Sequence, residues 1–256
     1  MDVILTAGGT PTPDEPLFAY SNGLPKAMIP IGDKPMIQWV LDALAAAKTI
    51  KRVVLIGLAD EMKVEYPRDL VRIEDQHGMV ENILAGVQTL RSYPDPSQYA
   101  LIAASDVPAV TPEAIDWVSE ETVKSQKDLI YTVVSKPVME KRFPESKRSY
   151  IPLKDMSICG GDINAIDMTK INYDNPLYRK LIATRKNALK QASLLGFDTL
   201  LLILFRAINL EQTEKKVCRR LEVNGKVLPS PYAEIAMDVD KPGQLELLRN
   251  DLLNRS

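Results

Sequence analysis

The chain has 256 residues, of which 45% are hydrophobic, and its formal net charge at pH 7 is −2. This length and composition suffice for one sizeable core, so we expect a single domain over residues 1–256. The charges are interspersed along the sequence, which excludes a typical nucleic-acid-binding surface. Cys159 and Cys218 lie far apart and the sequence does not open with a signal-peptide pattern, so we expect a cytoplasmic protein.

The first half of the chain alternates continuous apolar runs with helical patterns. Strands are expected at residues 3–7, 52–57 and 99–105, and helices at 36–47, at 78–90 and from 111. Continuous apolar strands separated by helices are typical of a mostly parallel central sheet with helices on both faces. The pattern predicts a Rossmann-like α/β fold, in which ligands bind at the carboxyl ends of the strands.

The second half of the chain departs from this repeat. Residues 128–139 and 149–167 are expected to be extended segments joined by a basic turn, and an added helical segment is expected over residues 175–221. The run 193–210 is nearly all apolar, but Gly196 is expected to end one helix and Asp198 to be the N-cap of the next. No uninterrupted run therefore reaches the ~18 residues of a membrane span. A buried helix is the simplest interpretation, and a homodimer surface over residues 194–210 or a surface for an apolar ligand is the alternative.

Ala7, Gly8 and Gly9 follow directly after the first expected strand, and Lys26 lies in the stretch GLPKAMIPIGDKPMI. A triphosphate requires backbone amides that approach closely and side-chain cations that offset its charge. A glycine pair by itself most often makes only a tight turn, and a single lysine is commonly solvated. The combination of both features before a helix favours a triphosphate site. Lys34, at the entry to that helix, is expected to be solvated.

The stretch LTAGG followed by PKAMIPIGDKPMIQWVLDAL resembles the opening signature of the nucleotidyltransferase superfamily, including MobA-like NTP transferases and sugar-phosphate nucleotidyltransferases. The resemblance implies a GT-A-like fold over nearly the whole chain, with a divergent helical insertion at residues 175–221. It also implies that Ala7, Gly8, Gly9 and Lys26 bind the nucleotide and that Lys26 is catalytic. Members normally carry an arginine shortly after the glycines, whereas this chain has two acidic residues and no basic residue before Lys26.

Three aspartates lie where a metal ion would be expected. Asp106 follows the expected strand 99–105, where a carboxylate can hold Mg²⁺, although it can equally cap the next helix. Asp238 and Asp240 are two residues apart, which in an extended segment points both to one side. The resemblance implies that Asp106, also catalytic, and Asp238 hold Mg²⁺ and that Asp240 caps the last helix. Both metal ligands should then lie within about 6 Å of each other.

Further nucleotide contacts are implied in the segment DQHGMVENILAGVQTL. It resembles the nucleotide-base loop of the family, which assigns base contacts to Gln76, Gly78 and Asn82. An ordinary helix start explains the same residues equally well.

A basic stretch follows between residues 141 and 154, where the family has its acceptor-binding segments. The resemblance assigns acceptor contacts to Arg148, Gly161, Asp162 and Asn164. A basic loop suits an acceptor that carries phosphate, whereas a solvated turn is the alternative.

The function implied by this resemblance is a Mg²⁺-dependent nucleotidyltransferase that moves an NMP group from an NTP to a phosphorylated small-molecule acceptor and releases pyrophosphate. Two alternatives remain: a catalytically impaired nucleotide-binding protein, because the arginine is missing, and a GT-A glycosyltransferase that uses a nucleotide-sugar. An NAD-dependent oxidoreductase is disfavoured because AGGTPTP lacks the third glycine of the dinucleotide-binding motif.

Overall fold

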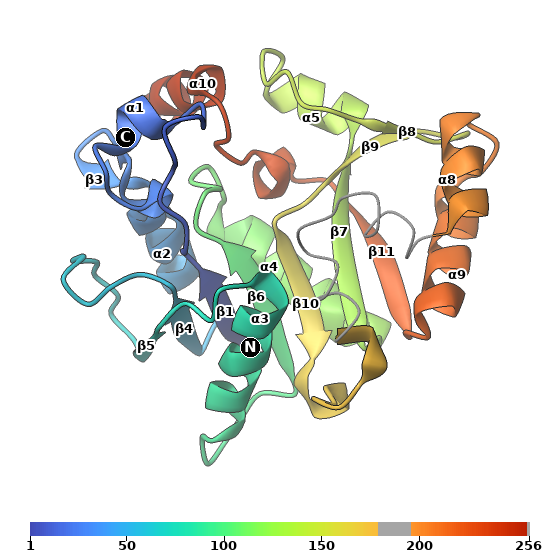
Figure 1. Cartoon of the computed structure of the whole chain (residues 1–256), viewed down its shortest axis with the longest axis horizontal. Helices are drawn as coiled ribbons and strands as arrows, with labels where there is room; N and C mark the ends of the chain where they lie inside the picture. The colour runs from blue at the N-terminus through green and yellow to red at the C-terminus, as the bar shows by residue number, and fades with distance from the viewer. Residues whose placement is uncertain (179–195, 255–256) are drawn as a thin grey trace.

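The structure is a computed structural model that describes residues 1–178 and 196–254. In these residues a nine-stranded mixed sheet has the order β5-β4-β1-β6-β10-β7-β9-β8 (Figure 1). The ninth strand, β11, lies outside this order and pairs with β7. The strands are β1 (Asp2–Thr6), β4 (Arg52–Ile56), β5 (Leu70–Ile73), β6 (Tyr99–Ala104), β7 (Leu129–Ser135), β8 (Ile151–Pro152), β9 (Ser157–Gly160), β10 (Ile163–Asp167) and β11 (Gly225–Ser230).

The parallel core of the sheet confirms the predicted α/β fold. Strands β5, β4, β1 and β6 are parallel neighbours, as expected from their continuous apolar sequences. The second half differs from the expected pattern because β10 inserts antiparallel between β6 and β7. The sheet is therefore mixed.

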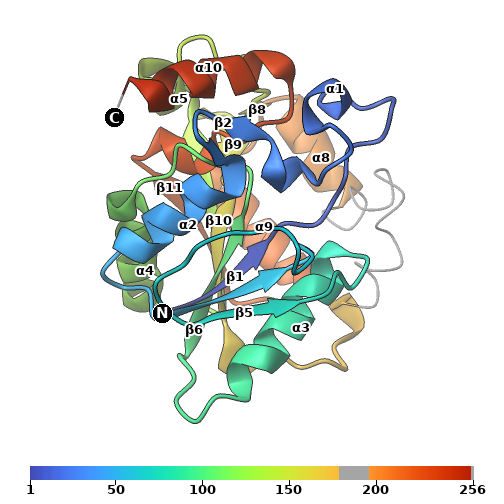
Figure 2. The same cartoon turned by 90° about the vertical axis from the view of Figure 1, so that its left-hand side faces the viewer.

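Helices cover both faces of the sheet, because successive side chains of a strand point to opposite faces. Val3 and Leu5 of β1 pack in one cluster with α2 (Met36–Ala46), α4 (Pro112–Ser125) and α10 (Pro242–Leu253). Ile4 packs in a second cluster with α3 (Met79–Arg91). Figure 2 shows α2 and α4 on one side of the sheet and α3 on the other.

Short elements complete the fold around the sheet. They are α1 (Phe18–Ser21), the 3-10 turns η1 (Lys26–Met28), η2 (Met168–Lys170) and η3 (Ala233–Ala236), and the hairpin β2 (Pro30–Ile31) and β3 (Lys34–Pro35). The extended segment predicted at residues 128–139 is wrong beyond Ser135, because α5 (Lys136–Arg142) begins there with a proline in its first turn. Strands β5 and β11 were not expected from the sequence.

The added helical segment is described in part, as α8 (Phe197–Leu204) and α9 (Leu210–Leu221). Helix α8 packs against α9 and β8, and α9 packs against β11. A new helix begins here, as predicted, but its N-cap is Gly196, at φ 94°, and the prediction of Asp198 as the N-cap is wrong because Asp198 lies in the first turn. Residues 179–195 of the predicted helical stretch lie outside the described residues.

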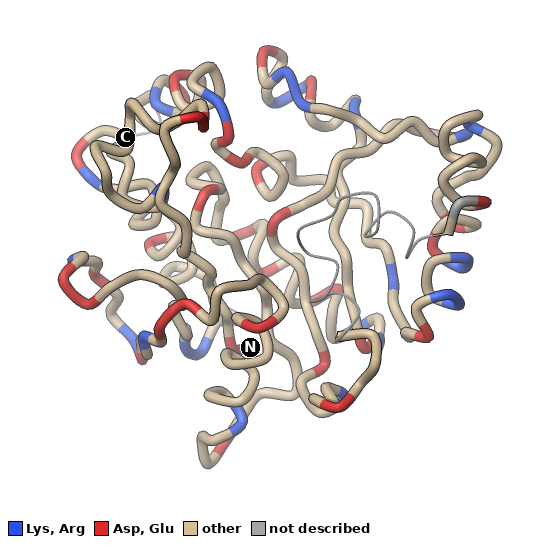
Figure 3. The backbone as a smooth tube through the Cα atoms, in the orientation of Figure 1, with Lys and Arg blue, Asp and Glu red and all other residues tan. Residues whose placement is uncertain are grey.

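No helix in the described parts of the chain is long and apolar enough to cross a membrane. Figure 3 shows basic and acidic residues interspersed over the fold.

Candidate active site

The glycine turn after β1 folds back onto the segment that carries Lys26. Ala7 N donates to Ile56 O at 2.8 Å, which continues the β1–β4 pairing, and Lys26 N donates to Gly9 O at 3.0 Å. Gly9 has a φ of 112°, a region that side chains rarely adopt. Gly8, Gly9, Lys26 and Asp240 line a cavity of about 180 Å³ over this turn.

Lys26 lies between two carboxylates. Its Nζ is 2.7 Å from Asp106 Oδ2 and 2.7 Å from Asp240 Oδ1. Burial by itself would lower the pKa of Lys26, but the ion pairs with Asp106 and Asp240 outweigh it and raise the pKa above its usual value. The ammonium group is therefore fixed and charged beside the glycine turn.

Asp106 and Asp240 meet because the chain crosses the end of β6. Val239 N donates to Asp106 O at 2.9 Å, so the segment before α10 lies along the residue that follows β6. Two acidic side chains separated by 134 positions in the sequence thus share one cation.

The prediction that Asp240 caps the last helix is wrong. Helix α10 begins after Lys241, and Gln244 Oε1 accepts hydrogen bonds from Asp240 N and Lys241 N, both at 2.9 Å. The Gln244 amide satisfies these donors, which leaves the Asp240 carboxylate for Lys26.

Asp238 has a different partner from the one expected. Its carboxylate forms an ion pair with Arg148, and both side chains are largely buried. Arg148 was predicted to bind the acceptor and Asp238 to bind a metal ion. Either role would have to compete with this ion pair, because separating two buried charges is costly.

The predicted base loop lies against the glycine turn. Asn82 Oδ1 accepts from Gln76 N at 2.7 Å, and Asn82 Nδ2 donates to Asp75 Oδ1 at 2.8 Å. Gly78 is the N-cap of α3, and a Cβ added to Gly8 would lie 3.4 Å from Asp75 Oδ1. The structure thus brings the two predicted nucleotide-binding segments together, and Asn82 orders the loop between them.

A further cavity adjoins this loop at the carboxyl ends of β4 and β5. It measures about 400 Å³, and its lining includes Gly57, Arg72 and Asp75. A Cβ on Gly57 would lie 2.8 Å from Gly8 Cα, so this cavity and the one over the glycine turn are separated only by closely packed backbone.

Gly161, Asp162 and Asn164 form the junction between β9 and β10. Asn164 Oδ1 accepts from Thr132 N at 2.9 Å, and Asn164 Nδ2 donates to Gly161 O at 3.0 Å. A Cβ on Gly161 would meet Thr132 Oγ1 at 2.2 Å, so only glycine fits. Gly161 and Asn164 thus use their polar groups within the sheet, where they fix the position of Asp162.

Asp162 is the buried carboxyl group of this region. Its backbone is held by bonds to Ala104 and Ile235, while Oδ2 is buried without a hydrogen-bond partner. Burial, together with the nearby negative charge of Asp106, raises the pKa of Asp162 to about 7.

In the described parts of the chain, no three His, Cys, Asp or Glu side chains are grouped as a metal centre. The residues described above give the candidate site a glycine turn, one lysine and paired carboxylates, at the carboxyl ends of parallel strands. Residues 4–220 match the MobA-like NTP transferase domain.

The chain belongs to this family. It is thus a nucleotidyltransferase by family. A hypothetical transferase from Thermus thermophilus has 31% sequence identity and a TM-score of 0.81, over 95% of this chain and 98% of that one.

Two other proteins are similar to this chain to different extents. A stretch of 97 residues, or 36% of this chain, is 31% identical to the bifunctional protein GlmU of Thermus thermophilus and spans only 21% of that protein's length. The 2-C-methyl-D-erythritol 4-phosphate cytidylyltransferase from Thermus thermophilus has a TM-score of 0.56 at 12% identity, covering 99% of this chain and 98% of that one. At this identity the likeness shows the fold alone.

Sequence reasoning within the MobA-like family pattern missed Asp240 as a partner of Lys26. It also gave no role to Asp75, the first residue of the predicted base loop, which binds Asn82. The DVD spacing placed both Asp238 and Asp240 near the site, but the resemblance favoured Asp240 as a helix cap and so gave it no partner in the site.

Proposed function

We propose that this chain transfers an NMP group from an NTP to a phosphorylated small-molecule acceptor and releases pyrophosphate. The observation that carries the proposal is Lys26, held at 2.7 Å from both Asp106 and Asp240 at the edge of the Gly8–Gly9 cavity. A charged lysine and backbone amides at one turn suit a triphosphate. The cytidylyltransferase named above supports this proposal through its shared fold.

The proposed arrangement places the base against the loop that Asn82 orders and the phosphates over the glycine turn. An oxygen of the acceptor phosphate forms a bond to the α-phosphorus, and the bond from the α-phosphorus to the bridging oxygen breaks as pyrophosphate leaves. An anionic phosphate is already a nucleophile, so the attack requires no proton transfer. Lys26 would offset the charge on the phosphates, and the packed glycine turn would fix their position.

Mg²⁺ is the metal ion that suits this donor set. Asp106 and Asp240 already point carboxylate oxygens at one cation, the Lys26 ammonium, and Mg²⁺ prefers carboxylate and phosphate oxygens. We assign the two ligands to Asp106 and Asp240 in preference to Asp238, because Arg148 neutralises Asp238. The ion, when bound, would supply further charge neutralisation to the phosphates.

The proposal is tested by incubating the protein with each NTP, Mg²⁺ and a panel of phosphorylated acceptors while pyrophosphate is measured. Asp106→Asn and Asp240→Asn should each lower turnover by about 100-fold or more, whereas folded Asp238→Asn should keep most of it. Loss in Asp238→Asn with retention in Asp240→Asn would reverse the ligand assignment. Nucleotide binding without pyrophosphate release would instead support the alternative function, a catalytically impaired nucleotide-binding protein. The absence of an arginine near Gly9 is the observation that favours this alternative.

A homodimer is the partner that the described helices support best. Leu201, Leu204 and Phe205 at the end of α8 are 53%, 70% and 75% exposed. Large apolar groups clustered on one surface are typical of an interface. We propose that a second copy of the chain covers them. Residues 194 and 195 of the surface expected from the sequence lie outside the described residues.

A further inference from the structure

A large cavity lies on the other side of the turn formed by Asp240 and Lys241. It measures about 960 Å³ and lies between the loop 144–147, which follows α5, and the first turns of α10. The cavity over the glycine turn includes Asp240, and this one includes Lys241. The linings of the two cavities therefore meet at adjacent residues of the chain.

The charged lining of this cavity is mainly basic. Lys147 and Lys241 are exposed, and neither forms an ion pair with any residue that the structure describes. Glu145 is the acidic residue of the lining. Two unneutralised ammonium groups facing one hollow favour an anion with more than one negative charge.

Gln244 adds an amide donor to the lining. The residue is 8% exposed, and its Oε1 is occupied by the backbone amides of Asp240 and Lys241. This arrangement fixes the amide orientation, so Nε2 remains as a donor that has no acceptor among the described residues. A donor that is held in place without an acceptor favours an oxygen ligand.

The walls of the cavity are held together by ion pairs. Arg142 at the end of α5 lies 2.9 Å from Glu234 of η3 and 2.7 Å from Asp251 of α10. Ser146 N also donates to Phe143 O at 3.1 Å, which closes the turn beneath Lys147. The lysines and the amide are thus carried on a preformed frame, which lowers the entropic cost of binding.

We infer that this cavity is the acceptor site and that the acceptor's phosphate lies against Lys147, Lys241 and Gln244 Nε2. The inference rests on the proposed function, because the acceptor must approach the α-phosphorus from the side away from the leaving pyrophosphate. Its position supports it: Lys241 of this cavity directly follows Asp240, which lines the cavity over the glycine turn, so an acceptor bound here lies beside the nucleotide's phosphates. The ligand class is a phosphate monoester, and the carbon skeleton occupies the remaining volume.

Inorganic phosphate is the probe for the test, measured by calorimetry and by NMR of the backbone amides. The full chain is titrated with phosphate both alone and after saturation with Mg²⁺ and the non-cleavable α,β-methylene analogue of whichever NTP binds. Wild type should bind phosphate in both cases, with shifts at Ser146 and Lys241. Phosphate that is displaced by the nucleotide analogue would overturn the inference, because the cavity would then hold the nucleotide's own phosphates.

Two variants and a control give the test its specificity. The double change Lys147→Ala and Lys241→Ala should weaken phosphate binding at least ~10-fold, since it removes two charge-assisted hydrogen bonds. Gln244→Glu keeps an acceptor for the two backbone amides but replaces the donor with a negative charge, and it should weaken binding to a similar degree. The control is Lys170→Ala on η2, beyond the far end of β10, which should change nothing.

Equal phosphate affinity in wild type and the two variants would overturn the inference, as would an equal loss in Lys170→Ala, which would show only a general charge effect. Failure of the proposed function has a different signature: no NTP binds and no pyrophosphate appears, while the phosphate titration can still be measured.

Discussion

Lys26 is the only cation described at the glycine turn, and its Nζ lies 2.7 Å from an oxygen of each candidate carboxylate. We predict that Lys26→Ala slows pyrophosphate release, because the variant loses about 2–4 kcal/mol of transition-state stabilisation. No arginine from the loop can replace the lysine. Lys34→Ala is the matched control. Lys34 pairs with Asp42 and lies 3.9 Å from the centre of the Trp39 ring, so the expectation that it is merely solvated is wrong, yet it lies outside the site. Near-normal turnover in folded Lys26→Ala would show that the triphosphate is held elsewhere.

The same ammonium group occupies the position that we propose for the metal ion. In the absence of nucleotide, Lys26→Ala should therefore bind Mn²⁺ at least ~10-fold more tightly than wild type, because Asp106 and Asp240 lose their competing cation and repel each other. Electron paramagnetic resonance of free Mn²⁺ measures this directly. Adding Asp240→Asn to the variant should remove the gain, and an unchanged Mn²⁺ affinity would separate the lysine site from the metal site.

Asp162 should make stability depend on pH. Its folded pKa of about 7 exceeds the ordinary value of 3.8, so the folded state binds the extra proton between these values. Stability is then highest when Asp162 is protonated and falls as pH rises from about 4 to 7. Relative to Asp162→Asn, wild type should lose on the order of 1–4 kcal/mol across this range. Urea unfolding with a chelator at pH 5 and pH 8 measures the difference, and parallel pH profiles would contradict it.

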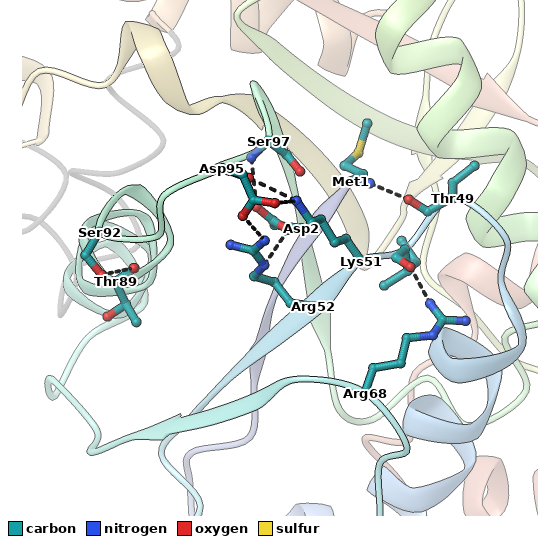
Figure 4. Close-up of polar contacts among 11 residues, drawn as sticks. Met1, Asp2, Thr49, Lys51, Arg52, Arg68, Thr89, Ser92, Asp95 and Ser97 are labelled. Carbon is teal, nitrogen blue, oxygen red and sulfur yellow. Dashed lines mark hydrogen bonds and ion pairs between the residues drawn. The ribbon is translucent and has the colours of Figure 1, made fainter.

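At the scale of elements, the amino-terminal ends of β1 and β4 are joined by a buried ion pair. Asp2 and Arg52 are directly paired in the sheet, are 0% and 3% exposed, and lie 3.4 Å apart between Oδ1 and Nε. Asp95 and Ser97, which precede β6, bind the same two side chains (Figure 4). Hydrogen bonds from Lys51 and Arg52 lower the pKa of Asp95 to about 2. The network fixes the register of three parallel strands.

Removing one member of this pair should cost far more than removing both. Arg52→Leu leaves the Asp2 carboxylate buried without its cation and should lower the free energy of unfolding by about 3–5 kcal/mol. The double variant with Asp2→Asn should recover part of that loss. Chemical denaturation of wild type, Arg52→Leu, Asp2→Asn and the double variant measures the coupling, and additive effects of the two changes would show that the ion pair contributes none.

Helices and strands of the first half were predictable because each satisfies its own periodicity. Helix α4, for example, begins as expected at Thr111, whose side chain accepts from Ala114 N, with Pro112 in the first turn. Strand β11 was not predictable. Its sequence GKVLPS includes a proline and lacks alternation, and its pairing with β7 depends on a partner about 95 residues earlier in the chain.

At the scale of the whole molecule, we propose that the chain forms one domain, since a single buried cluster extends from Val3 to Leu252.

The exposed apolar end of α8 predicts the oligomeric state of the protein in solution. Light scattering should show a dimer, and Leu204→Asp should convert it to a monomer with unchanged secondary structure. Val123→Asp is the control, because Val123 is likewise exposed, at 56%, but lies on α4. A monomeric wild type would contradict the dimer.

The sequence by itself determined the parallel core, the glycine turn, Lys26 and the family, because these depend on residues that are close in the chain. The roles of Asp238 and Asp240 were decided only by the tertiary structure. The two aspartates are only two residues apart, but Arg148 reaches one and Lys26 the other, and Lys26 is 214 positions away from Asp240. Such long-range ion pairs depend on strand order and on where each strand ends. Local propensity carries no information about either, so the partner of a carboxylate is known only once the sheet is assembled.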